Sequence, residues 1–177
     1  MTPGACGSGW SWVAASQILV DSSSATLATT DSLTLKCGAS TRPYRRDKGQ
    51  AMRCRWRVLS SNVSAMDVGV TTNAPEEVSA VDTLYAQQGW SCWYDCGDSR
   101  VWPLSEPNAK PITKYSCNVD DLVDLHLVGS ELYVDINEKR LSVQPISQKV
   151  PAEVRFCAML GQGYQKLQLV SVEYYPC

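Results

Sequence analysis

The sequence lacks the features that mark several classes of protein. Its formal net charge is −2, from 16 basic and 18 acidic residues, so bulk electrostatics gives no reason to expect a nucleic-acid or membrane partner. No segment approaches the roughly 18 consecutive apolar residues of a membrane-spanning helix. The first residues show no basic stretch followed by an apolar one, so we expect no signal peptide.

The chain is also poor in the residues that catalysis uses most often. It has one histidine, His126, which lies in an alternating apolar and polar segment and shares a face with Asp124. No matched serine or cysteine nucleophile motif accompanies it. We therefore expect His126 to be an exposed or half-buried strand residue, and we predict that the protein is not an enzyme and needs no cofactor.

The acidic residues do not form a recognisable metal or glycosidase pattern. Asp120, Asp121 and Asp124 lack the glycine and terminal glutamate of a calcium loop, so we expect them to be solvated at the start of a strand. Asp95 and Asp98 stand on either side of a glycine and are expected to form a turn rather than a catalytic carboxylate pair. We predict no metal site.

The eight cysteines allow two interpretations. An even number of cysteines is compatible with four disulfides in a secreted domain. Cys54 and Cys157, however, stand where a small apolar residue would serve, and a chain of this length does not need disulfides to be stable. Cys92 and Cys96 have no second pair, and one histidine in the chain is too few to complete a zinc site. We favour reduced thiols and an intracellular location, and an extracellular location if the cysteines are bridged.

Residues 119–141 give the clearest structural signal. Apolar side chains occupy alternate positions on both sides of Gly129-Ser130, a dipeptide suited to the tight turn of a β-hairpin. A second reversal is expected at Asn137-Glu138. This segment predicts two antiparallel strands with one buried face.

Similar alternation predicts strands along the rest of the chain. The expected strands are 16–20, 25–29, 32–37, 52–59, 66–71, 90–96, 100–104, 115–117, 151–160 and 167–175. Within 52–59, alternation places Met52, Cys54, Trp56 and Val58 in the core. A short helical turn is expected only within 72–89. Many short strands without a long helix predict an all-β fold, a two-layer antiparallel β-sandwich, as one domain over residues 1–177.

Four segments, in this order and spacing, resemble the SPRY family of β-sandwich interaction modules. They are RCRWRVLSSNVSAMDVGVT, GWSCWYDCGDSRVW, DDLVDLHLVGSELYVDINEKRL and VPAEVRFCAMLGQGYQKLQLV. The best-matched region covers residues 54–170. The chain departs from the family's sequence pattern at Glu138, because in the family a glycine often follows the hairpin asparagine. Concanavalin-like and laminin-G-like sandwiches share the hairpin pattern.

The resemblance implies a non-enzymatic module for protein–protein interaction. It would recognise a peptide or folded protein through loops at one end of the sandwich, as a monomeric domain of a larger intracellular protein such as a ubiquitin-ligase adaptor that recognises substrates. Aromatic anchors with a charged residue to fix the register are typical of such surfaces. By this analogy the partner-binding candidates are Tyr44, Arg45, Arg46, Asp67, Trp90 and Trp93.

The alternative is an extracellular carbohydrate-binding domain of the concanavalin or laminin-G type. It would stack tryptophan rings on sugars and carry disulfides. The Asn62-Val63-Ser64 sequon matters only if the chain is secreted. A glycan-cleaving enzyme on the same scaffold needs two carboxylates that face one cleft, and the sequence offers no convincing pair.

Overall fold

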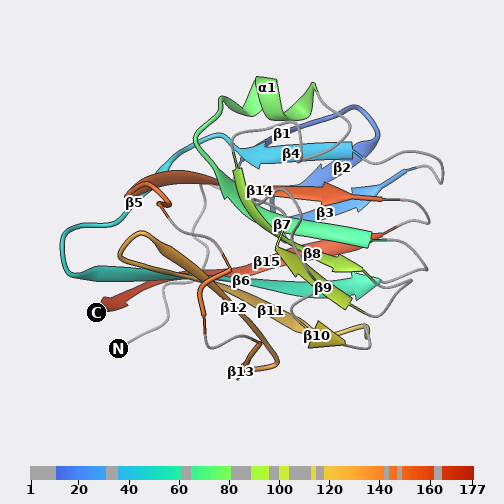
Figure 1. The fold of residues 1–177 in the computed structure, drawn as a ribbon. Coiled ribbons are helices and arrows are strands. Elements are labelled where there is room, and N and C mark those ends of the chain that lie inside the picture. Colours follow the sequence, from blue (N-terminus) through green and yellow to red (C-terminus); the bar gives the residue numbers. More distant parts are fainter. Residues whose placement is uncertain are drawn as a thin grey trace.

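Two antiparallel β-sheets stack face to face in the computed structural model (Figure 1). The structure describes residues 11–30, 36–60, 65–80, 89–95, 100–103, 113–114, 118–141, 144–146, 149–161 and 165–177. Within these residues the predicted all-β, two-layer sandwich is confirmed. No helix in them is long and apolar enough to cross a lipid bilayer.

One sheet runs in the order β1-β4-β14-β7-β8-β9-β10, with β5 paired to β14. Its strands are β1 (Trp12–Ala14), β4 (Lys36–Ser40), β5 (Tyr44–Arg45), β7 (Ala65–Thr71), β8 (Gly89–Asp95), β9 (Arg100–Pro103), β10 (Thr113–Lys114) and β14 (Glu153–Leu160). The helix α1 (Pro75–Ser79) lies over the outer face of this sheet (Figure 1). Val78 of α1 packs there in a small cluster with Cys37, Ala39, Cys157 and Met159.

The second sheet runs in the order β13-β12-β11-β6-β15-β3-β2. Its strands are β2 (Ile18–Asp21), β3 (Thr26–Thr29), β6 (Gln50–Ser60), β11 (Leu122–Val128), β12 (Glu131–Ile136), β13 (Lys139–Arg140) and β15 (Lys166–Pro176). The long strands β6 and β15 pair along most of their lengths and form the centre of this sheet.

The core lies between the two sheets, where alternate residues of each strand point inward. In β6 the expected residues Met52, Cys54, Trp56 and Val58 are all fully buried. The indole of Trp56 meets that of Trp12 edge to face, with ring centroids 5.6 Å apart. The prediction of this inward face is therefore confirmed, and Trp56 is a core residue.

The hairpin predicted over 119–141 is present as β11 and β12. Leu125 pairs with Val134 in its register, and Gly129 has φ +58° at the turn. The second reversal is formed by Asn137 and Glu138, which both have positive φ. The helical turn expected within 72–89 is α1.

Two acidic residues expected to be solvated are instead buried. Asp121 and Asp124 are 4% and 1% exposed. Asp121 accepts hydrogen bonds from the backbone N–H of Asn118 and from the side-chain amide of Asn137. Asp124 lies on the outer face of its sheet, where arginine side chains cover it. The expected strand over 115–117 lies outside the described residues, as do the first residues of the one expected over 32–37.

Candidate functional site

The connection between β4 and β6 is a structured basic loop at one end of the sandwich. Its strand β5 pairs with the start of β14, and the N–H of Arg46 donates to the carbonyl of Ala152 (2.9 Å). A tight turn follows, in which Gly49 has φ +79°, and the Gly49 carbonyl accepts a hydrogen bond from the N–H of Cys177 (3.1 Å). The loop is thus fixed to both sheets, because β14 and β15 belong to different ones.

An aromatic residue anchors this loop to the core. Tyr44 is 6% exposed, and its ring lies against that of Phe156, with centroids 4.5 Å apart. The guanidinium of Arg42 lies over the Tyr44 ring at 4.8 Å, within the range of a cation–π contact. Tyr44 therefore holds the loop in place against the core.

Arg46 is the buried cation of the loop. Its side chain is 4% exposed, and Nη2 donates to the carbonyl oxygens of Pro151 (2.7 Å) and Val150 (3.5 Å). Its Nε and Nη1 atoms are buried without a hydrogen-bond acceptor. Burial lowers the pKa of Arg46 from its ordinary value, because the protein solvates the charged form less well than water does.

Tyr174, near the end of β15, is an exposed aromatic side chain beside the basic loop. It is 41% exposed. Burial of the rest of the residue raises the pKa of its hydroxyl, and so do Tyr44 and Asp47, while Arg42 and Arg46 lower it. Sequence reasoning missed Tyr174, because it belongs to the last strand and only the fold brings it next to Tyr44 and Arg46.

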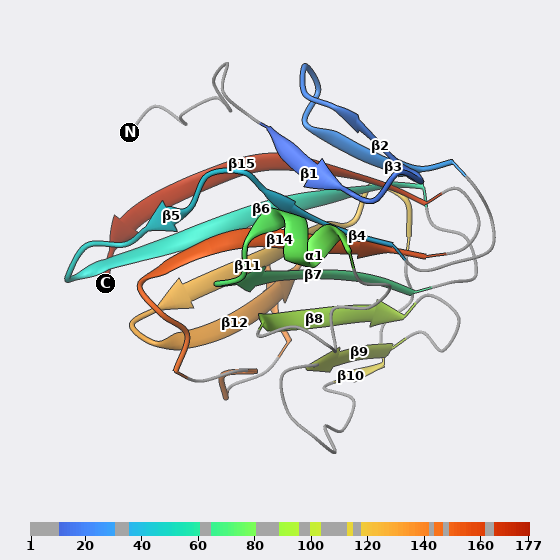
Figure 2. The same ribbon diagram turned by 90° about the horizontal axis from the view of Figure 1, so that it is seen from above.

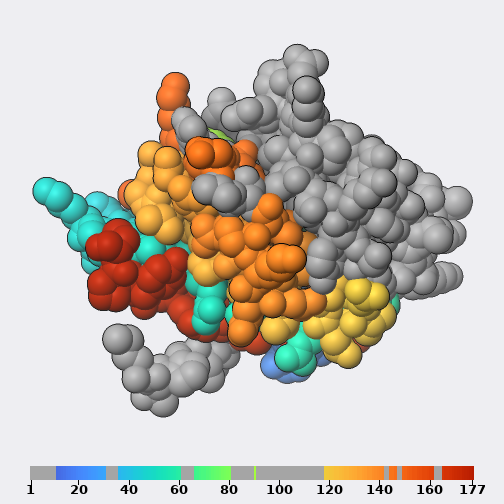
Figure 3. Space-filling model, turned by 60° about the horizontal axis from the view of Figure 1, so that its bottom comes forward, coloured from blue at the N-terminus to red at the C-terminus, as the bar shows by residue number. Residues whose placement is uncertain are grey.

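We call Arg42, Tyr44, Arg45, Arg46, Lys48 and Tyr174 the basic end. An open groove of about 430 Å³ lies along it. The groove is lined by Arg45, Arg46, Asp47, Lys48, Gly49, Gln50, Gly129, Ala152 and Cys177. Figure 2 shows β5, the start of β6 and the C-terminal end of β15 together at this end. In the space-filling view of Figure 3, the same two β6 and β15 segments, in teal and red, form one edge of the molecule.

The six residues predicted from sequence to bind a partner fall in different places. Tyr44, Arg45 and Arg46 come together in the basic end, with the Arg45 side chain exposed and the other two buried. The structure places the remaining three, Asp67, Trp90 and Trp93, on strands β7 and β8.

Asp67 does not lie on a free surface. It is 0% exposed, although it lies on the face of β7 that points away from the core between the sheets. Its charge adds to burial in raising the pKa of the Cys157 thiol well above its ordinary value. Asp67 is therefore a buried residue in this structure.

The two tryptophans lie on the neighbouring strand β8. Trp90 is half-buried and packs against the main core, which makes it part of the fold. Trp93 pairs with Asp67 across β7 and β8, and its side chain is outside the described residues. Neither residue belongs to the basic end.

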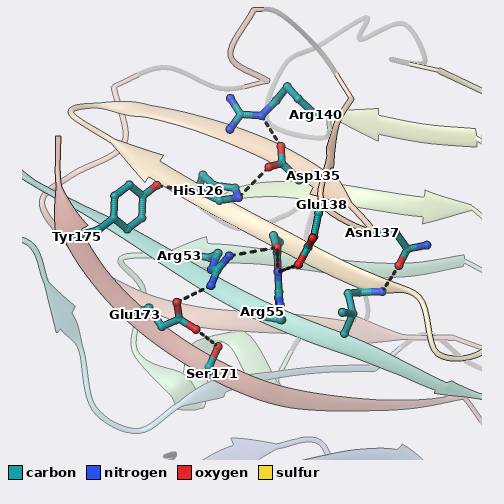
Figure 4. Close-up of polar contacts among 12 residues, drawn as sticks. Arg53, Arg55, His126, Asp135, Asn137, Glu138, Arg140, Ser171, Glu173 and Tyr175 are labelled. Carbon is teal, nitrogen blue, oxygen red and sulfur yellow. Dashed lines mark hydrogen bonds and ion pairs between the residues drawn. The ribbon is translucent and has the colours of Figure 1, made fainter. Parts of the chain in front are cut away.

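A second polar cluster covers the outer face of the other sheet (Figure 4). Arg55 of β6 donates from Nε and Nη2 to the two carboxylate oxygens of Asp124 on β11, each at 2.7 Å. Arg53 of β6 pairs with Glu173 of β15. Asp135 of β12 pairs with Arg140 of β13. These pairs link neighbouring strands across the sheet.

His126 sits in the same cluster between two polar partners. Its Nδ1 lies 3.1 Å from the Tyr175 hydroxyl, and its Nε2 lies 3.0 Å from a carboxylate oxygen of Asp135. The carboxylates of Asp135 and Asp124 favour the protonated ring, but burial outweighs them and lowers the pKa of His126 from its ordinary 6.5. His126 is thus a half-buried strand residue, as the sequence predicted.

The comparisons with known proteins bear on the fold. No family model matches the sequence. No curated protein matches it either. Solved structures do resemble the fold. The SPRY domain of human HERC1 shares 13% identity at a TM-score of 0.61, covering 92% of this chain and 98% of that domain.

Two further solved structures resemble the fold. The carbohydrate-binding module CBM66 from Bacillus subtilis shares 11% identity at a TM-score of 0.60, covering 92% of this chain and 94% of the module. The exoplasmic/lumenal domain of VIP36, in a Ca²⁺/Man-bound form, shares 10% identity at a TM-score of 0.62, covering 95% and 83% of the two chains. At these identities the likeness concerns the fold, and the chain has a SPRY-like, concanavalin-like β-sandwich fold.

Proposed function

We propose that this chain is a non-enzymatic recognition module that binds a peptide or a folded protein at the basic end. The observation that carries the proposal is an open groove lined by the exposed side chains of Arg45 and Lys48, on a fixed loop that also lies near the exposed ring of Tyr174. Rigid aromatic rings and arginines supply much of the binding energy at protein interfaces. The resemblance of the fold to SPRY domains supports the same function.

The frame around the groove favours binding at low entropic cost. The loop is fixed by backbone hydrogen bonds to β14 and β15, and Tyr44 is packed on Phe156 beneath it. A preorganised surface loses little conformational freedom when a partner binds. The buried thiol of Cys157, which forms no disulfide, is compatible with a reducing, intracellular setting for this function.

The test uses a displayed library of short random peptides, selected on the purified protein. Affinities of the selected peptides are then measured for wild type, Tyr174→Ala, Arg45→Ala and the control Leu19→Ala. Leu19 is an exposed apolar residue (62%) on β2, outside the basic end. We expect the first two variants to weaken binding by about tenfold or more each, and Leu19→Ala to leave it unchanged.

Two results would contradict the proposal. One is a set of selected peptides that bind all four proteins equally, because the basic end would then not be the binding surface. The other is strong, saturable binding of the protein to an array of glycans without any peptide selection, which would favour the carbohydrate-binding alternative.

A further inference from the structure

Arg46 is a buried guanidinium whose donors are only partly used. Nη2 has two carbonyl acceptors, while Nε and Nη1 have none. Arg46 forms no ion pair with any residue that the structure describes. Buried polar groups without partners are uncommon in folded proteins, and each costs free energy that a bound partner can recover.

The same protein shows how a buried arginine is satisfied when its role is structural. Arg55 has a side chain 15% exposed, and its Nε and Nη2 both donate to Asp124, whose side chain is 2% exposed. Its charge is thus matched by a carboxylate in a planar, two-point contact. Arg46 is less exposed and has no such two-point carboxylate contact among the described residues, and a carboxylate is an acceptor that suits its unused donors.

The surroundings of Arg46 also favour an anion. Arg46 lines the groove of the basic end together with the exposed side chains of Arg45 and Lys48. Asp47 is the one carboxylate side chain among the lining residues, against three basic ones. Cys177 also lines the groove, and its negative charge raises the pKa of Arg46 against the larger effect of burial. A local excess of positive charge in a chain whose net charge is −2 attracts negatively charged groups to this end.

We propose that Arg46 anchors a carboxylate of an acidic peptide segment, the side chain of an aspartate or glutamate of the partner, in the groove of the basic end. This inference rests on the proposed function and specifies the partner's chemistry. A guanidinium also binds phosphate. A phosphate monoester, with its charge near −2, would be attracted to the same basic residues, so the experiment compares a phosphoserine peptide with the matched glutamate peptide.

The experiment repeats the peptide selection on wild type, Arg46→Met, Arg46→Lys and the control Lys166→Gln. Lys166 is exposed at the first position of β15, so the control removes one positive charge outside the basic end. We expect wild type and Lys166→Gln to enrich peptides with aspartate or glutamate. For those peptides, Arg46→Met should weaken binding by about 10- to 100-fold, the range for a lost charge-assisted contact.

Arg46→Lys tests whether binding needs the planar guanidinium or only its positive charge. It also provides a second variant in case Arg46→Met does not fold. A lysine keeps the charge but cannot make the planar two-point contact, so its affinity should fall between those of wild type and Arg46→Met. In wild type, the Arg46 Nε–H signal in a nitrogen–proton NMR spectrum should shift when an acidic selected peptide is added. The same peptide with each glutamate replaced by glutamine and each aspartate by asparagine should not shift the signal.

The outcomes distinguish this inference from the proposed function. Two results would overturn the carboxylate anchor and leave the basic end as a binding surface. One is that the selected peptides carry no acidic residue, although Tyr174→Ala weakens their binding. The other is that the Arg46 Nε–H signal does not shift when an acidic peptide is added. Preference for a phosphoserine peptide over the matched glutamate peptide would also overturn the carboxylate anchor. Selected peptides that bind without dependence on the basic end overturn both.

Discussion

The carboxylate of Asp124 accepts two hydrogen bonds of 2.7 Å from the Nε and Nη2 atoms of Arg55, although both residues point away from the core between the sheets. Asp124 is 1% exposed. Hydrogen bonding to Asp124 raises the pKa of Arg55 against the opposing effect of burial. The pair thus keeps two charges in a position where either one alone would be costly.

Removing one member of this pair should strongly destabilise the protein. Asp124→Ala leaves the Arg55 guanidinium without its acceptor, and we expect the free energy of unfolding to fall by about 3 kcal/mol. Urea unfolding followed by circular dichroism measures the change. The control Glu153→Gln, at an exposed carboxylate of β14, should change stability by less than about 0.5 kcal/mol.

The double variant Asp124→Leu with Arg55→Met tests the reason for that loss. Replacement of both charges by apolar groups removes the unpaired ion, so it should recover part of the stability lost in Asp124→Ala. A double variant that is less stable than Asp124→Ala would contradict the explanation.

The alternation of residues predicted which side chains face the core between the sheets, and it could not predict what covers the outer faces. Asp67 shows the limit. It lies between the inward residues Met66 and Val68, so alternation places it on the face of β7 that points away from the core, and the family resemblance implied a partner-binding residue there. Asp67 is nevertheless 0% exposed, so both faces of β7 are covered. Nothing in the local sequence of β7 signals this cover.

The candidate site could be predicted only in part, for a related reason. The basic loop is continuous in sequence, so Arg45 and Arg46 were visible as a charged segment. Tyr174 lies far along the chain, and its place beside them depends on the pairing of β15 with β6. The burial of Arg46 likewise depends on carbonyls of Val150 and Pro151. Contacts between distant segments are not encoded in local periodicity.

Trp90 and Tyr174 should respond differently to truncation. Trp90 packs against the main core, so we expect Trp90→Ala to lower the free energy of unfolding by about 3 kcal/mol. Tyr174 is 41% exposed, and Tyr174→Ala should cost about 1 kcal/mol or less. Thermal and urea unfolding of both variants measure this. Equal stability losses would mean that Trp90 is not a core residue or that Tyr174 is one.

Stability should fall as the pH drops below the ordinary pKa of histidine, and His126 should account for part of the fall. Burial lowers the pKa of His126 in the folded protein, so just below pH 6.5 the unfolded chain binds a proton that the folded protein does not. The free energy of unfolding therefore decreases from about pH 7.5 to about pH 5.5. Asp124, Asp135, Arg53 and Arg140 set the local field on the ring.

The variant His126→Gln isolates this contribution. Glutamine does not titrate, so the difference in unfolding free energy between the two pH values should be smaller in the variant than in wild type. Urea unfolding at both pH values provides the comparison. A variant with the same pH dependence as wild type would show that other groups cause the whole effect.

The turn between β12 and β13 contains a residue in an unfavourable backbone conformation. Glu138 has φ +66°, in the left-handed region, where side chains other than glycine and asparagine are disfavoured. Its carboxylate is 3.6 Å from Arg55, but the side chain is 76% exposed, so this ion pair contributes little to stability.

Glu138→Gly should therefore stabilise the protein by about 0.5 to 1 kcal/mol. Glu138→Gln, which keeps the strain and removes the charge, should change stability by less than about 0.5 kcal/mol. A Glu138→Gly variant less stable than Glu138→Gln would mean that the backbone strain is smaller than the entropy lost with glycine.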